Sequence, residues 1–214
     1  MRTPLVTAAV LATLVAGAPA AQASIIFMSS PSFVQPDENL LYNAAGLLQG
    51  PALTVQGATN RTRTIFNLTG TENLVTPSGG QARVDDESNS GFDSLFIDAL
   101  DSGVLYREFE ANLNAEGDGV ANIQVFDDGG EEFNFAFDVR AGGQNYFGLQ
   151  AIDGQLIDTV LITTAGVELQ DVRQIRVGGI LKDGAPPDTV PEPTAVALLG
   201  LGLLGAGYAR RRRS

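Results

Sequence analysis

The chain contains no cysteine, no histidine and no tryptophan. Without cysteine it has no disulfide framework and no thiolate nucleophile. Without histidine it lacks the commonest general base and the usual protein ligand of zinc. These absences exclude serine–histidine–aspartate hydrolysis, cysteine proteolysis and histidine-based zinc catalysis. Carboxylate-only chemistry, such as glycoside hydrolysis by two acids, stays open on residue type.

Basic residues are few beside acidic ones, 13 against 25. Glu192, Arg2 and the four arginines near the C-terminus belong to the terminal segments described below, which leaves the body with 24 acidic and 8 basic residues. A surface with this excess of negative charge repels phosphate backbones, so we expect no nucleic-acid partner. The charge suits cations or keeps an exported protein soluble, and the second interpretation is favoured.

Residues 1–23 have the features of a secretory signal peptide. Arg2 supplies a positive charge, residues 5–18 are apolar, and Ala21 and Ala23 form the small-residue pattern that signal peptidase recognises. The apolar run is short for a membrane span of about 20 residues. We therefore expect cleavage after Ala23 rather than a permanent anchor.

Residues 191–214 form a second processing segment. Pro191, Glu192 and Pro193 precede an uncharged run, residues 194–209, that is rich in leucine, glycine and alanine. At ~1.5 Å per residue this run makes a short transmembrane helix. The arginines that follow it mark the cytoplasmic side; they are Arg210, Arg211, Arg212 and Arg213. The domain before the helix is therefore expected outside the cytoplasm, in agreement with the signal peptide.

Proline-glutamate-proline, a short glycine- and leucine-rich helix and a terminal arginine cluster, in this order, resemble the sorting tail of PEP-CTERM proteins. The resemblance implies that Pro191, Glu192 and Pro193 are the motif recognised by an exosortase at the inner membrane. It also implies a Gram-negative host that makes exopolysaccharide and biofilm. A membrane-inserted precursor would then become a cell-surface or extracellular protein.

The body between these segments is predicted to be all-β. Residues 133–140 alternate phenylalanine with small or polar residues, which is typical of a strand with one buried and one wet face. Phe109, Ala111 and Leu113 alternate in the same way with Glu108, Glu110 and Asn112. Further strands are predicted in the following ranges: 52–56, 62–68, 82–85, 94–100, 122–126, 146–152, 157–163 and 173–178.

Glycine-containing turns separate these segments at short intervals, which favours antiparallel pairing. Many short strands of this kind predict a two-sheet, jelly-roll-like sandwich. One short helix is expected at 40–48. We assign 1–23 to the signal peptide, 24–180 to the sandwich, 181–190 to a linker and 191–214 to the sorting tail.

Two loops are rich in oxygen ligands, residues 85–91 (DDESNSG) and 127–132 (DDGGEE). Calcium binds six to eight oxygens and often takes them from such loops. Neither loop has the ligand spacing of an EF-hand, and a solvated turn explains each of them more simply. No cofactor is therefore expected, with calcium kept as the alternative.

Three functions remain open for the body. The first, which we favour, is a non-catalytic surface or matrix protein associated with exopolysaccharide. The second is a carbohydrate-binding module for the cell's own exopolysaccharide. The scarcity of exposed aromatic residues weakens it, because sugar sites usually stack rings on aromatic faces. The third is a carboxylate-dependent glycan hydrolase, and nothing in the sequence singles out an acid–base pair.

Overall fold

The structure is a computed structural model that describes residues 24–29, 34–77 and 82–182. These ranges form twelve strands and no helix. No helix that could cross a membrane is found in them. The strands are β1 (Ser24–Met28), β2 (Glu38–Leu41), β3 (Ala52–Thr59), β4 (Ile65–Val75), β5 (Arg83–Asp86), β6 (Ser94–Ala99), β7 (Glu108–Ala115), β8 (Gly119–Asp127), β9 (Glu132–Val139), β10 (Gly142–Ile152), β11 (Ile157–Ala165) and β12 (Leu169–Gly178).

The strand order is that of a jelly roll. Strands β5, β12, β7 and β10 pair in that order, and β6, β11, β8 and β9 form a second set. From β5 onward the chain crosses between the two sets at every step except the β8–β9 hairpin. This alternation gives the two Greek keys of a jelly-roll sandwich. The predicted all-β, jelly-roll-like fold is therefore confirmed.

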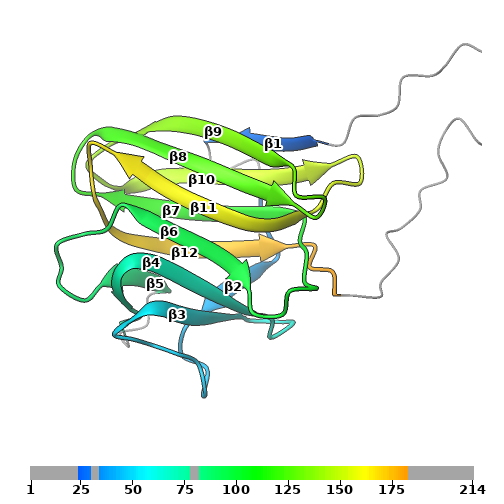
Figure 1. The fold of residues 1–214 in the computed structure, drawn as a ribbon, viewed down its shortest axis with the longest axis horizontal. Coiled ribbons are helices and arrows are strands. Elements are labelled where there is room, and N and C mark those ends of the chain that lie inside the picture. Colours follow the sequence, from blue (N-terminus) through cyan, green and yellow to red (C-terminus); the bar gives the residue numbers. More distant parts are fainter. Residues whose placement is uncertain (1–23, 30–33, 78–81, 183–214) are drawn as a thin grey trace, which may run out of the picture. The chain divides into compact units, whose positions relative to one another are not determined.

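The remaining strands extend the two sets. Strand β1 pairs with the outer edge of β10, while β4 and β3 extend the second set beyond β6. Strands β2 and β5 both pair with β12. In addition, β2 pairs with β3, and β5 pairs with β4. Hydrogen bonds therefore join the sheets along one side. We call β1-β10-β7-β12 with β2 and β5 the first sheet, and β3-β4-β6-β11-β8-β9 the second sheet (Figure 1).

Aromatic packing closes the opposite side, where β1 and β9 are the outer strands. The ring of Phe27 from β1 stacks on Phe135 of β9, with centroids 5.2 Å apart, and lies 5.5 Å from Phe137. Phe147 of β10 completes this cluster, with its ring centroid 5.8 Å from that of Phe137. The alternating phenylalanines predicted to form a strand at 133–140 therefore hold the first sheet to the second.

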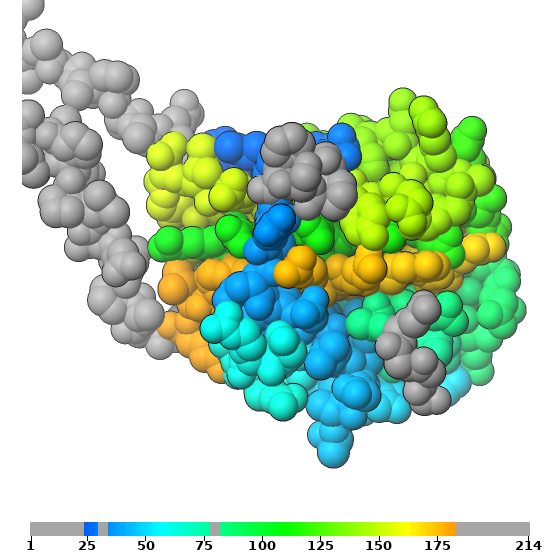
Figure 2. All heavy atoms as spheres, turned by 180° about the vertical axis from the view of Figure 1, so that it is seen from behind, coloured from blue at the N-terminus to red at the C-terminus, as the bar shows by residue number. Residues whose placement is uncertain are grey.

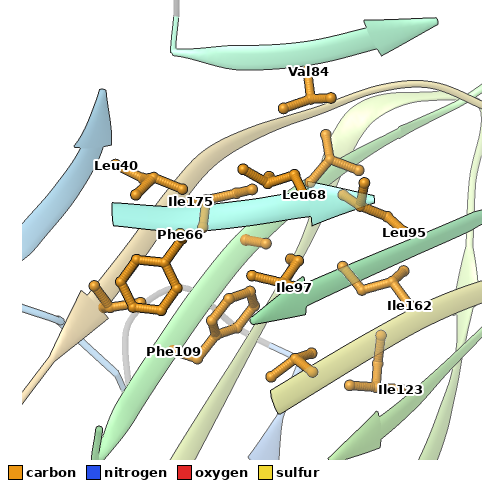
Figure 3. Close-up of a cluster of buried hydrophobic side chains, with 14 of the residues drawn as sticks. Leu40, Phe66, Leu68, Val84, Leu95, Ile97, Phe109, Ile123, Ile162 and Ile175 are labelled. Carbon is orange, nitrogen blue, oxygen red and sulfur yellow. The ribbon is translucent and has the colours of Figure 1, made fainter. Parts of the chain in front are cut away.

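The core fills the space between the sheets (Figure 3). Side chains at every second position of β4, β6, β11 and β8 point inward and meet those of the first sheet. Their burial is complete or nearly so; the central members are Leu40, Phe66, Leu68, Val84, Leu95, Ile97, Phe109, Ile123, Ile162 and Ile175. Removing this apolar surface from water is the main force that stabilises the sandwich.

Several sequence predictions need correction. The helix expected at 40–48 is wrong: Leu40 lies in strand β2 and is 1% exposed, and the chain then turns toward β3. Strands β1 and β2 were not predicted. The strand expected from residue 62 begins at Ile65, because residues 60–64 form the β3–β4 turn.

The alternation predicted for β7 is half wrong. Phe109, Ala111 and Leu113 face the core as expected, but Glu110 and Asn112 on the other face are also buried, at 5% and 1% exposure. The Glu110 carboxylate lies 3.8 Å from the guanidinium of Arg176. The Asn112 side chain donates to the carbonyl of Gly143 at 2.9 Å. The outer face of the first sheet is therefore covered in part.

Residues 34–37, which we call the strap, provide part of this cover. They precede β2 and cross the outer face of the first sheet, where Figure 2 shows them in blue. Two glycines make room for them. A Cβ atom on Gly148 would lie 2.7 Å from Val34 Cγ2, and one on Gly178 would lie 3.1 Å from the Cα of Pro36. Val34 is 2% exposed as a result.

Replacing Gly148 with alanine should displace the strap. We expect Gly148→Ala to lower the free energy of unfolding by about 1–3 kcal/mol, because the added methyl group has no space. Urea denaturation of the purified protein measures this change. Gly117→Ala is the control, since a Cβ there meets only Val167 Cγ2 at 3.7 Å. Equal stability of the two variants would contradict the role assigned to Gly148.

Candidate functional site

The outer face of the second sheet is open. Figure 1 looks onto this sheet, and no other strand passes in front of it. Its side chains come from the positions that alternate with the core residues, and most are half-buried. We call this surface the ladder face; its residues are Thr54, Gln56, Asn67, Thr69, Ser94, Phe96, Asp98, Gln124, Phe126, Glu132, Asn134, Asp158, Thr159, Leu161 and Thr163.

An apolar stripe runs through the centre of the ladder face. Phe96 of β6 lies directly opposite Leu161 of β11, and Phe126 of β8 lies opposite Thr159. These side chains point away from the core, because their neighbours along each strand point into it. Two aromatic rings and a leucine therefore stand half-buried on the wet side of a sheet, where polar residues are the usual occupants.

Hydrogen-bonded polar side chains border the stripe on both sides. On β3, β4 and β6, the Gln56 amide donates to Asn67 Oδ1 at 3.1 Å, and the Asn67 amide donates to Asp98 Oδ2 at 3.3 Å. On β8 and β9, Gln124 and Asn134 both donate to Glu132 Oε1 at 2.6 Å. These bonds fix the planes of the amide and carboxylate groups, so the polar groups are held in place before any ligand arrives.

The ionisable side chains of the ladder face are all acidic. Burial raises the pKa of Asp98, against the effect of the Asn67 hydrogen bond. Burial also raises the pKa of Asp158, and the nearby charges of Asp98, Asp128 and Asp127 raise it further. The pKa of Glu132 is lowered instead, by the hydrogen bonds from Asn134 and Gln124.

This arrangement matches the two-sided chemistry of sugar rings. A pyranose presents an apolar face of C–H groups and a rim of hydroxyl groups. Aromatic rings bind the first through their faces, while oriented amides and carboxylates exchange hydrogen bonds with the second.

The first sheet carries a separate group of charges on β5 and β12. Asp85 of β5 lies opposite Asp171 of β12, and Arg83 lies opposite Arg173. Like charges thus face each other across the strands, and pairing along each strand compensates them. Arg173 binds both oxygens of Asp171, at 2.5 Å each, and Arg83 lies 3.0 Å from Asp85.

These two aspartates are the closest match to an acid–base pair, but their contacts are structural. Asp171 is 3% exposed and accepts a further hydrogen bond from Asn114 at 2.7 Å. Burial raises the pKa of Asp85, while the charge of Arg83 opposes this shift. Asp171 is thus held by Arg173 and Asn114, whereas Asp85 is paired with Arg83 through one oxygen, and its buried Oδ1 has no hydrogen-bond partner among the described residues.

A hollow of about 620 Å³ lies at the β9–β10 connection. Phe137, Arg140, Gln144, Asn145 and Tyr146 are among its lining residues. The Asn145 side chain is engaged by the protein itself, since its NH2 group, with two hydrogens, lies within hydrogen-bond distance of the carbonyl oxygens of residues 113, 140 and 142. Tyr146 donates to Gln174 Oε1 at 2.6 Å. The lining side chains therefore mainly shape the connection.

The oxygen-rich loop at 85–91 is organised by its own hydrogen bonds. Asp86 accepts from Ser88 Oγ at 2.6 Å and from the backbone N–H groups of Ser90 and Gly91 at 3.0 and 3.1 Å. In the loop at 127–132, Asp127 accepts from the Glu131 N–H and from the Gln155 amide. Within the described ranges, no three acidic side chains converge as metal ligands would. The expectation of no cofactor, with calcium as the alternative, stays a prediction.

The site residues predicted from the sequence lie outside the described ranges. This holds for Ala21 and Ala23 of the signal peptide, for the sorting motif and for the arginine cluster, the last two being Pro191, Glu192, Pro193, Arg210, Arg211, Arg212 and Arg213. Their roles therefore rest on sequence alone.

Comparison with known families decides what the C-terminal segment is. A family model described as the PEP-CTERM protein-sorting motif matches residues 189–213. The chain carries a PEP-CTERM sorting motif. The resemblance found at Pro191, Glu192 and Pro193 is thereby confirmed. No curated protein sequence matches the chain.

The solved structures that are similar in fold include two carbohydrate binding modules. One is a family 29 carbohydrate binding module from Piromyces equi, 12% identical, with a TM-score of 0.29 over 79% of this chain and 97% of that one. The other is a variant of the module CBM29-2, 15% identical, with a TM-score of 0.33 over 69% and 96%. Both scores are too low for either module to serve as a template for this chain.

The ladder face was not predicted as a site from the sequence. A signal was present in two predicted strands, 94–100 and 157–163, where Phe96 and Leu161 occupy positions that alternation assigns to the wet face. Its meaning depended on strand order, because only pairing of β6, β11 and β8 brings these residues beside Phe126.

Asp86 should make stability depend on pH. Its hydrogen bonds outweigh the effect of burial and leave its pKa below the ordinary value. The stabilisation is therefore present above the unfolded-state pKa of ~3.9 and is lost as the pH falls through the lower folded-state pKa. We expect Asp86→Asn to lower the free energy of unfolding by about 1–3 kcal/mol at pH 7. Denaturant melts should show this difference shrinking below about pH 4; a difference that is constant with pH would contradict the assignment.

Proposed function

We propose that this exosortase-sorted, exported protein resides at the cell surface or in the extracellular matrix and binds exopolysaccharide there through its ladder face. The sorting motif identifies the chain as an exported protein that an exosortase processes. The association with polysaccharide rests on one observation: the stripe of Phe96, Leu161 and Phe126 between two hydrogen-bonded polar borders. Of the functions left open by the sequence, a binding module is thus favoured for the body.

We further propose that the protein is not an enzyme. Glycoside hydrolysis needs two carboxyl groups, one to donate a proton and one to act as base or nucleophile. On the first sheet, Asp85 and Asp171 are bound by Arg83 and Arg173. On the ladder face, Glu132 is held in its ionised form by two amide donors. These contacts suit a surface that binds and releases polymer unchanged.

For the tail, we propose that Glu192 between Pro191 and Pro193 is presented in extended form to the exosortase. Proline keeps the chain out of the helix that follows, so the carboxylate stands at the outer surface of the inner membrane. The helix at 194–209 lodges in the bilayer, and Arg210 to Arg213 hold its end in the cytoplasm. Signal peptidase would remove residues 1–23 at the other end.

Removing the charge of Glu192 should block sorting. In the protein's own host, we expect Glu192→Gln to accumulate as a full-length, membrane-bound precursor, while the native protein loses its tail. Intact mass spectrometry of both forms measures this. Asp188→Asn, a matched change just before the motif, should be processed as the native protein is. A native protein that still ends in Ser214 would show that the tail is a permanent anchor.

The aromatic stripe should carry most of the affinity for polysaccharide. We expect Phe96→Ala and Phe126→Ala each to weaken binding about threefold to tenfold, since aromatic contacts contribute about 0.5–1.5 kcal/mol beyond area burial. Affinity electrophoresis through gels that contain the host's own exopolysaccharide measures the change. Ile26→Ala is the control, because Ile26 is 39% exposed and lies in β1 of the first sheet rather than in the second sheet. Native mobility that is unaffected by the polysaccharide would refute the proposed function.

A further inference from the structure

The positive charges of the body are segregated away from the ladder face. None of its eight basic residues lies in a strand of the second sheet. Three are in the first sheet, and the other five lie in turns or in segments beside strands; the eight are Arg61, Arg63, Arg83, Arg107, Arg140, Arg173, Arg176 and Lys182. An acidic polymer approaching the ladder face would meet no cation there to neutralise it.

The ladder face carries negative charge that the chain itself leaves uncompensated. Asp98, Glu132 and Asp158 form no ion pair with any basic side chain of the described residues. Asp98 and Glu132 are bound by neutral amides only, and hydrogen bonds from amides do not cancel a charge. By contrast, Asp85 and Asp171 on the first sheet each have an arginine.

Each of the three carboxylates is placed beside the apolar stripe. Glu132 lies directly opposite Phe126 across β8 and β9. Asp158 precedes Thr159, the β11 partner of Phe126, at an irregularity in the β11–β8 pairing. Asp98 shares the outer face of β6 with Phe96, two residues away. A cation bound here would contact a carboxylate and the face of an aromatic ring together, and both interactions favour it.

We infer that the polysaccharide bound by the ladder face carries free amino groups, as a glucosamine polymer does; this inference rests on the proposed function. Protonated amines spaced along the polymer complement the three carboxylates, while the sugar rings lie on Phe96, Leu161 and Phe126. A polymer of uronic acids is repelled by the same charges. Burial raises the pKa of Asp98 and of Asp158, and a bound ammonium group would offset that cost by favouring the ionised carboxylates.

Three soluble hexamers test the inference, namely those of glucosamine, N-acetylglucosamine and galacturonic acid. With native protein purified from its host, at pH 6 and low salt, we expect the glucosamine hexamer to bind about tenfold more tightly than the acetylated one, a difference of about 1.4 kcal/mol. The galacturonate hexamer should bind most weakly. Isothermal titration calorimetry measures all three, and added salt should reduce only the preference for the amine.

Paired variants separate charge from stacking. Asp98→Asn combined with Glu132→Gln should abolish the preference for glucosamine, so that this variant binds the glucosamine and acetylated hexamers with equal affinity. Glu116→Gln, which removes one exposed carboxylate in the β7–β8 turn, should retain the full preference. Phe96→Ala should weaken binding of both sugars equally.

Two outcomes overturn the inference in different ways. Equal affinity for the glucosamine and acetylated hexamers, or tighter binding of galacturonate, refutes the amine requirement and leaves the proposed function intact. The same conclusion follows if the host polysaccharide retards the protein and no hexamer binds. If neither the hexamers nor the host polysaccharide bind, the proposed function fails and the inference fails with it.

Discussion

Each strand of the second sheet has to satisfy two environments, because successive side chains point to opposite faces. The inner positions of β4, β6, β11 and β8 are committed to the core by Phe66, Ile97, Ile162 and Ile123. The outer positions do not form part of the core, so their composition reflects the surroundings that the outer face contacts. Rings and leucine at these positions add little to the core, and they are the reason for assigning a binding role to this surface.

The two outer faces of the sandwich differ in how their polar side chains are accommodated. On the first sheet, the strap covers part of the outer face, and ion pairs neutralise Asp85 and Asp171. On the second sheet, the polar side chains bind one another in lines across the strands and remain at the surface. Covering one face and leaving the other open makes the ladder face the surface to which the proposed binding of a polymer is assigned.

The sequence was sufficient where the physical signal is local. Alternation predicted β9 and the central parts of most other strands, and the order of motif, apolar run and arginines identified the sorting tail. It was insufficient where partners come from distant parts of the chain. Alternation assigned Glu110 and Asn112 to the solvent-exposed face. They are buried, and their side chains lie beside Arg176 and Gly143 respectively. Leu40 was assigned to a helix, because its pairing with Thr59 can be recognised only when β2 and β3 are aligned. The ladder face depends on strand order in the same way.

Strand β1 has a consequence for the order in which the molecule assembles. Among the described strands, its residues Ser24 to Met28 pair with β10 alone, where Met28 lies opposite Gly148. An exported chain emerges with its N-terminus first, so this strand reaches the far side of the membrane long before its partner does. Until β9 and β10 have emerged, Phe27 has no aromatic neighbour to pack against, and β1 is an unpaired hydrophobic strand. Pairing of β1 with β10 therefore joins distant parts of the chain and has to wait until β10 has emerged.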